Sequence, residues 1–117
     1  MAGARVAPKR RLRRQPRNAP TPEQLVKALG HPLRRRILRA IHDAGEARSS
    51  RELSITLDAI LSSVSYHVRV LRDAGALVLT DSRPVRGSME KFYASAVEDD
   101  RWLRLLLDAS QRQDGDG

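Results

Sequence analysis

The 117-residue chain contains no cysteine. Disulfides, thiolate metal ligands, redox switches and thiol nucleophiles all need cysteine, so these four kinds of chemistry are excluded. Aromatic residues are also scarce, since Tyr66, Phe92, Tyr93 and Trp102 are the only four. The core must therefore consist mainly of aliphatic side chains. A small domain with such a core often gains stability by dimerising.

No run of eighteen apolar residues is present, so the sequence predicts no membrane-spanning helix and no contact with a membrane. The N-terminus has the cations of a signal peptide but lacks its apolar segment. An organelle transit peptide needs an amphipathic helix, and Pro8, Pro16 and Pro20 would interrupt that helix. We therefore expect a cytoplasmic protein.

Acidic residues are absent from residues 1–20, which hold seven of the 22 cations. Residues 21–117 hold the other fifteen cations and all fourteen acids. Large aliphatic side chains are also rare in residues 1–20, so we expect a disordered basic tail. This tail could follow a nucleic-acid backbone and add affinity that depends on salt but not on sequence. The candidate contacts in the tail are Arg10, Arg11, Arg13 and Arg14.

Capping signals begin the folded part at Thr21. The segment Thr21–Gln24 combines an N-cap threonine, a proline at the first helical position and a glutamine three residues after the cap. Gly30 should end this first helix. A second helix is expected from Pro32 to Gly45.

A second capping box, Ser49-x-x-Glu52, opens the third predicted helix. Asp58 stands at its end, where a residue that tolerates left-handed backbone geometry is expected. After a tight turn, the fourth helix should run from about 62 to 74, with Gly75 as its stop. Two helices joined by a short turn form the helix-turn-helix pattern.

A hairpin and one more helix complete the predicted fold. Residues 77–80 and 90–94 alternate partly in polarity and predict two short strands joined by a polar loop. The last helix is expected over residues 97–112, before a disordered acidic end at 113–117. The fold class is therefore α+β: a winged helix-turn-helix of about five helices with a two- or three-stranded wing, occupying residues 21–112.

The fourth helix divides into an apolar and a polar face. At about 100° per residue, Val64, Val68 and Leu71 fall together on the side that should be buried. The opposite side offers small polar groups and two long side chains, an arrangement suited to a helix that lies in a DNA major groove. The candidate contacts of this helix are Ser62, Ser63, Ser65, Tyr66, His67 and Arg69.

Each of the long side chains has more than one possible role. Arg69 can bind guanine or neutralise a phosphate, and Tyr66 can pack on a thymine methyl or donate to a phosphate. His67 lies at the edge of the apolar stripe, which favours a hydrogen-bonded structural role over a phosphate contact. The polar face could also be ordinary solvent-exposed surface, but its place between a turn and a hairpin favours DNA binding.

Cations in the predicted hairpin suit the minor groove of DNA, where the negative potential is strong. The candidates are Arg83, Arg86 and Lys91. Part of the arginine cluster at 34–36 should follow a phosphate backbone, although three adjacent positions on a helix point in different directions.

These segments closely resemble the ArsR-like winged-helix regulators of bacteria, and more narrowly the small cysteine-free helix-turn-helix proteins of actinobacteria. The resemblance covers about residues 22–95. It rests on Ala28-Leu-Gly-His-Pro-Leu-Arg34, on Val64-Ser-Tyr-His-Val-Arg-Val-Leu-Arg-Asp-Ala-Gly75 and on Pro84-Val-Arg-Gly-Ser-Met-Glu-Lys-Phe-Tyr93. It departs from the family pattern at Ile60 and Leu61, where the fourth helix usually starts with polar residues.

The resemblance implies a homodimeric transcription factor, usually a repressor, that binds an inverted repeat in double-stranded DNA within the bacterial nucleoid. Dimers of this family form through the first and last helices. The implied dimer contacts are Leu25, Leu29, Trp102, Leu103 and Leu106. For Trp102, packing inside its own chain is an equally good interpretation.

Many of the family's members sense metals, but here no cysteine is present and the three histidines lack H-x-x-x-H spacing, so we expect no metal and no cofactor. No nucleophile–base pair or phosphate loop appears, so the sequence does not predict an enzyme. Two other functions stay open: an architectural or RNA-associated protein that relies on its basic tail, and a winged-helix module that docks on another protein. The sequence does not reveal a small-molecule effector.

Overall fold

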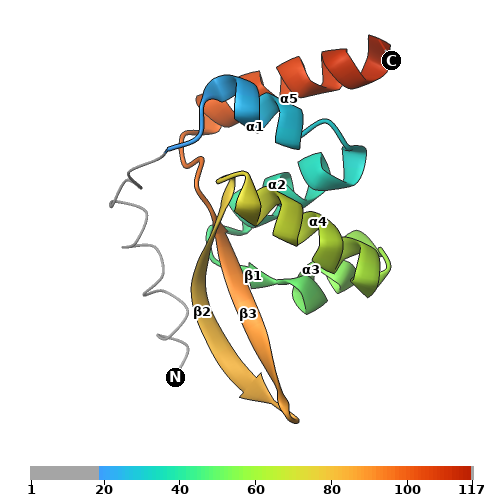
Figure 1. Cartoon of the computed structure of the whole chain (residues 1–117), viewed down its shortest axis with the longest axis vertical. Helices are drawn as coiled ribbons and strands as arrows, with labels where there is room; N and C mark the ends of the chain where they lie inside the picture. Colours follow the sequence, from blue (N-terminus) through green and yellow to red (C-terminus); the bar gives the residue numbers. More distant parts are fainter. Residues whose placement is uncertain (1–18, 117) are drawn as a thin grey trace.

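The computed structural model describes residues 19–116, which form five helices and one three-stranded antiparallel sheet. The elements in chain order are α1 (Pro22–Ala28), α2 (Pro32–Ala44), β1 (Arg48–Ser49), α3 (Ser50–Leu57), α4 (Leu61–Asp73), β2 (Leu77–Val85), β3 (Ser88–Ser95) and α5 (Asp100–Asp116). The hairpin of β2 and β3 extends away from the helices (Figure 1). This arrangement confirms the predicted α+β class and is that of a winged helix-turn-helix domain. The predicted contacts of the basic tail at Arg10, Arg11, Arg13 and Arg14 lie outside the described residues.

Both predicted capping boxes are present. The hydroxyl of Thr21 accepts from the backbone N–H of Gln24 at 3.1 Å, and the Gln24 side chain accepts from the N–H of Thr21 at 2.8 Å. Ser49 and Glu52 repeat this exchange at the start of α3, with both distances 3.1 Å. Two reciprocal bonds satisfy N–H groups that the helix itself cannot pair, which is why these residues fix where the helices begin.

Left-handed backbone geometry marks three of the helix ends. Gly45 ends α2 with φ 70°, Asp58 ends α3 with φ 52°, and Gly75 follows α4 with φ 86°. Gly75 also meets a steric limit, since a Cβ at this position would lie 2.9 Å from Cγ of Pro20. The predicted ends of the helix-turn-helix are therefore correct to within about one residue.

The hairpin is longer than predicted. Most of the segment expected to be a polar loop is strand, because β2 continues to Val85 and β3 starts at Ser88. Only Arg86 and Gly87 form the turn, with φ 46° and 84°, and positive φ at both positions is typical of a type I′ turn. Both faces of this exposed ribbon carry polar side chains, so the amino-acid composition of the ribbon resembles that of a loop.

A short third strand joins the hairpin to the helices. In β1, Arg48 pairs with Tyr93 and Ser49 pairs with Phe92, which gives the sheet order β1-β3-β2. A register shift between Leu79 and Asp81 bends β2. The sheet therefore fixes the base of the wing to the start of α3, since Ser49 is also the N-cap of that helix.

An aliphatic core lies between the helices, as the shortage of aromatic residues predicted. Its largest cluster draws on all five helices, and Leu29, Ile37, Leu71 and Leu103 have no more than 1% of their surface exposed. No helix of the described residues is long and apolar enough to cross a bilayer.

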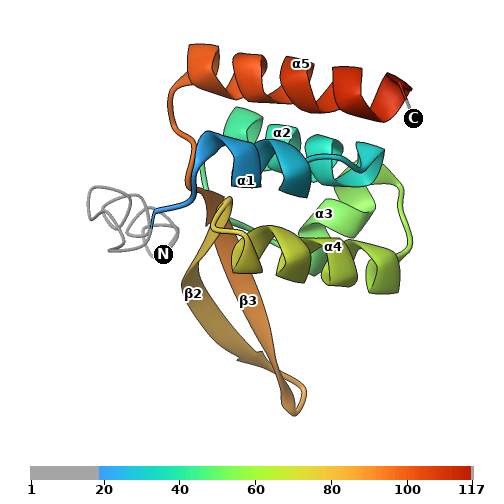
Figure 2. The same ribbon diagram turned by 45° about the horizontal axis from the view of Figure 1, so that its top comes forward.

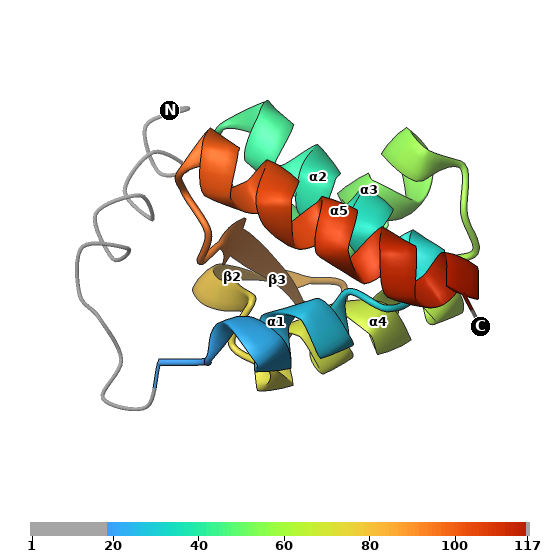
Figure 3. The same ribbon diagram turned by 90° about the horizontal axis from the view of Figure 1, so that it is seen from above.

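The last helix covers α1 and α2 on the side away from the hairpin (Figures 2 and 3). It begins at Asp100 rather than at 97, because Asp99 precedes it as a cap and its carboxylate accepts from the N–H of Trp102 at 2.9 Å. It continues to Asp116, through most of the segment expected to be a disordered end.

Most of the predicted dimer residues lie in the core of the single chain. Leu25, Leu29, Leu103 and Leu106 are buried within their own chain, so their contact with a second copy stays a prediction. Periodicity identified an apolar face correctly but could not say that α1 and α5 cover each other. Trp102 keeps 39% of its surface exposed and is the single predicted dimer residue that lies at the surface.

Candidate nucleic-acid interface

Helix α4, the fourth helix of the sequence analysis, has the two faces that its sequence predicted. Val64, Val68 and Leu71 are at most 1% exposed and anchor the helix to the core. On the outer side, Tyr66 is 54% exposed and Arg69 is also exposed. Neither residue is covered by another part of the described chain, so this face is open to a ligand.

The N-terminus of α4 has no side-chain cap. Ile60 occupies the N-cap position and makes no side-chain hydrogen bond to the first turn. The N–H groups of the first turn therefore point outward beside Ser62, which is exposed, and Ser63, which is half-buried. Such a helix start favours an anion both through its free donors and through the helix dipole.

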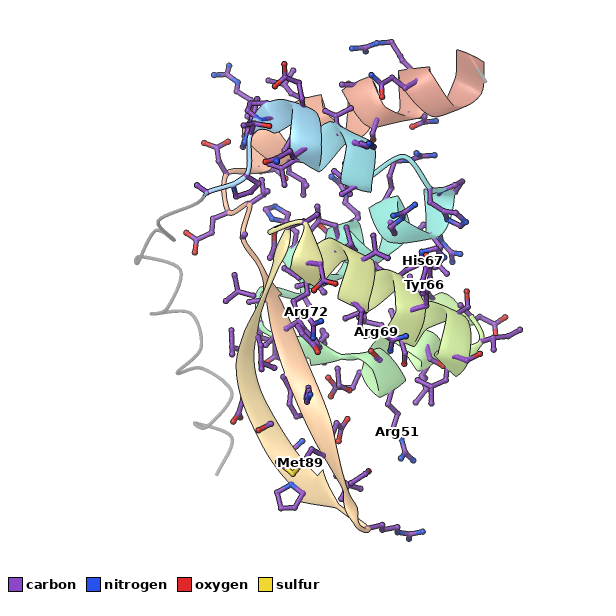
Figure 4. The ribbon with its side chains drawn as sticks, viewed as in Figure 1. Arg51, Tyr66, His67, Arg69, Arg72 and Met89 are labelled. Carbon is purple, nitrogen blue, oxygen red and sulfur yellow. The ribbon has the colours of Figure 1, made fainter. Side chains whose placement is uncertain are left out.

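A groove of about 390 Å³ separates α4 and the start of α3 from the hairpin. We call it the basic groove. Its lining includes Ser50 and Arg51 of α3, Leu61, Ser65, Arg69 and Arg72 of α4, and Met89, Glu90 and Lys91 of β3, with Ser49 of β1 and Val85 of β2 beside them. Figure 4 shows Arg51, Arg69 and Arg72 near the space beside the strand that carries Met89.

Positive charge dominates this groove, because four cationic side chains line it and Glu90 is the single acid among its lining residues. Glu90 is bound by the hydroxyl of Ser49, which donates to it at 2.6 Å. Arg72 donates to Asp73 at 2.9 Å, and this bond raises the pKa of the guanidinium above its ordinary value. For Arg51 and Arg69, the described residues provide no acidic partner within ion-pair distance.

The three predicted wing cations occupy different places. Arg86 is exposed in the turn at the tip, and Lys91 lines the basic groove. Arg83 belongs to strand β2 rather than to a loop, and its guanidinium lies 4.8 Å from the centre of the Phe92 ring. This cation–π contact ties Arg83 to the sheet, so Arg83 is less free to reach a ligand than the other two.

The structure does not place His67 on the predicted contact surface. His67 is 7% exposed, and its ring lies 4.3 Å from that of His31, the N-cap residue of α2. Burial lowers the pKa of His67 below its ordinary value, and the nearby His31 and Arg34 lower it further. Its Nδ1 atom is buried and has no hydrogen-bond partner among the described residues. His67 is thus a neutral packing residue between α4 and α2.

Two members of the 34–36 arginine cluster donate hydrogen bonds to carbonyl groups at helix ends, and the predicted phosphate contact of this cluster stays a prediction. Arg35 donates to the carbonyl oxygen of Leu29 at 3.0 Å, and Arg36 donates to that of Leu57 at 3.0 Å. Both carbonyls lie at helix C-termini, where acceptors lack partners within the helix.

Among the residues of the basic groove that sequence reasoning did not single out as contacts are Arg51, Arg72 and Met89. In sequence, nothing distinguishes Arg51 from an ordinary charge in the first turn of a helix, and Arg72 and Met89 lie in the family-like segments without a predicted role of their own. Their common feature is that they border the same groove. That proximity depends on the angle between α4 and the hairpin, which no local pattern contains.

Comparison with known families supports the class that the geometry defines. Residues 29–80 match the model of a family described as helix-turn-helix domain, a span that includes α2, α3 and α4. Among curated proteins, none matches the chain significantly. The chain therefore contains a helix-turn-helix domain, a class of module that binds DNA and typically has no enzymatic activity.

Proposed function

We propose that this protein is a sequence-specific transcriptional regulator of the ArsR-like type that acts as a repressor on double-stranded DNA. In this proposal α4 enters the major groove, with Ser62, Ser65, Tyr66 and Arg69 toward the base edges and phosphates. The hairpin lies beside it, where Arg86 reaches the minor groove and Lys91 a phosphate. Repression follows when the bound protein blocks a promoter.

One observation carries the proposal: cations without an acidic partner among the described residues lie beside the exposed face of a helix that stands next to a protruding hairpin. Arg51, Arg69 and Lys91 line one groove, and no acid pairs with Arg51 or Arg69 among the described residues. A groove with one sign of charge attracts a polyanion, and a helix is the element that fits the major groove. The match of residues 29–80 to a helix-turn-helix family supports the same assignment.

Dimerisation is part of the proposal. The outer face of α5 exposes Trp102 at 39% and Leu105 at 55%, and residues three apart lie on the same face of a helix. A second copy that covers this pair would place two recognition helices on one side of a duplex. The DNA site would then be an inverted repeat with half-sites about 34–36 Å apart, or one helical turn.

The decisive experiment is selection of bound duplexes from random DNA with the full chain. We expect an inverted repeat to be enriched, and one bound dimer per repeat by sedimentation. Enrichment of no sequence, with equal binding to RNA, would instead indicate an architectural nucleic-acid protein. Absence of DNA binding at physiological salt would favour a protein-docking module.

Replacement of Arg69 tests the recognition helix directly. Arg69→Ala should weaken binding to the selected site by about 1–3 kcal/mol and weaken binding to random duplex less. Arg104→Ala is the matched control, because Arg104 is an exposed cation on α5 and does not line the groove. Equal losses on both duplexes would assign Arg69 to a phosphate rather than to a base.

A further inference from the structure

The start of the recognition helix exposes aliphatic side chains where a polar surface is expected. Leu61 is 47% exposed and Ile60 is 74% exposed, although both are large and apolar. They stand at the first helical position and at the N-cap of α4. Exposing two adjacent aliphatic side chains to water is unfavourable. A surface that carries them is therefore a candidate contact for an apolar group.

Leu61 lies among the cations of the basic groove. It lines this groove together with Ser65, Arg69 and Arg72, which follow it on α4 at intervals of four, four and three residues. That spacing places all four side chains on one stripe of the helix. Any duplex that contacts Arg69 and Arg72 along this stripe therefore also meets Leu61.

The chemistry of the major groove offers one apolar partner for such a side chain. Every base pair presents polar atoms there, but thymine alone adds a methyl group at C5. Leu61 has no hydrogen-bonding group, so it gains nothing from the polar edges and gains from the methyl. Phosphates are a poor alternative for Leu61, because an apolar side chain that displaces their water makes no compensating bond.

We propose that Leu61 is a specificity-determining residue that packs on the C5 methyl of a thymine in each half-site. Ile60 flanks this contact and excludes water from it. The proposal rests on the function proposed above, since it requires α4 to lie in a major groove. To that function it adds the class of base that the start of α4 selects.

The test replaces thymine with uracil, one position at a time, in the site obtained by selection. Uracil pairs as thymine does but lacks the methyl, so the change removes a single apolar group. For the wild-type chain we expect one position per half-site to lose about fourfold in affinity, the amount that one buried methyl contributes. This measurement needs no variant, so it does not depend on a mutant that folds.

The variant Leu61→Ala then identifies the side chain. Alanine favours a helix and Leu61 is outside the core, so the fold should persist, and circular dichroism checks this. Binding to the thymine site should fall about fourfold, and the penalty for uracil at the sensitive position should disappear. Leu79→Ala is the matched control: Leu79 is a leucine with 43% exposure that does not line the groove, so its variant should retain the uracil penalty.

The outcomes separate the two proposals. Selection of a defined site at which no uracil change weakens binding would overturn the thymine contact and leave the regulator intact. A uracil penalty that persists in Leu61→Ala would also overturn it, since another side chain such as Tyr66 would then read the methyl. Failure to select any sequence would overturn both proposals.

Discussion

The two ends of this small domain use amphipathic helices in opposite ways. At one end α5 covers α1, and Leu25, Leu29, Leu103 and Leu106 disappear from the surface. At the other end no element of residues 19–116 covers the outer face of α4, which borders a groove lined by cations. The closed end provides the apolar burial that stabilises the domain, which allows the open end to keep charges unpaired.

The comparison also shows that only some of the cationic side chains are free to bind a ligand. The arginines at 35 and 36 lie between the two ends and are used to satisfy helix C-termini. Arg51, Arg69 and Lys91 are also cations, but they line a groove that no other described element fills. In the proposed function, DNA binding therefore depends on the cations that do not bond to another part of the domain.

The largest effect should come from breaking the closed end. Leu103 is fully buried, so Leu103→Ala should lower the free energy of unfolding by about 2–5 kcal/mol through lost burial and a residual cavity. Urea unfolding measures this loss. Arg104→Ala, at the next residue and with a side chain 63% exposed, should change stability by less than about 0.5 kcal/mol. Similar losses for both variants would contradict the described packing of α5.

The link between α3 and the wing is the next test. Ser49 caps α3 and donates to Glu90 at 2.6 Å, so it holds the helix-turn-helix to the base of the wing. Ser49→Ala should cost about 1–2 kcal/mol, because it removes the cap and leaves a carboxylate without this donor. Ser49→Thr retains the hydroxyl and should recover part of the loss. An unchanged midpoint in Ser49→Ala would show that the cap does not matter.

The role of the open end in DNA binding can be tested by removing a single cation that sequence reasoning missed. Arg51→Ala should weaken binding to selected and random duplexes about equally and lower the slope of log affinity against log salt by about one. Stability should not change, since Arg51 is exposed and no acid pairs with it among the described residues. Fluorescence anisotropy at several salt concentrations gives the slope. A loss confined to the selected site would assign Arg51 to a base instead.

The smallest effect concerns His67, which lies between α4 and α2. The folded state lowers the pKa of His67, so the unfolded chain binds this proton more readily. The contribution of His67 to the free energy of unfolding is thus fully present above about pH 6.5, and stability should fall as the pH drops below that value. His67→Gln removes the titration, so its stability should fall less than that of the wild type between about pH 7.5 and about pH 5.5. Parallel pH profiles would contradict a neutral, buried His67.

Local signals in the sequence were sufficient for the helices and for the exposed face of the recognition helix. The capping boxes at Thr21 and Ser49, and the left-handed ends at Asp58 and Gly75, act within a few residues. The hairpin was underestimated for a physical reason. An exposed ribbon with polar side chains on both faces has the composition of a loop, and only pairing between β2 and β3 distinguishes them.

By itself, the amino-acid sequence determined an aliphatic core, the positions at which the helices start and stop, and the division of α4 into a buried and an exposed face. These properties follow from backbone preferences and helical periodicity, which are local. The tertiary structure alone decided that α1 and α5 cover each other, that His67 is buried against His31, and that Arg51, Arg72 and Met89 border one groove. The physical reason is that burial and proximity depend on the angles at which elements pack, and residues far apart in the chain set those angles.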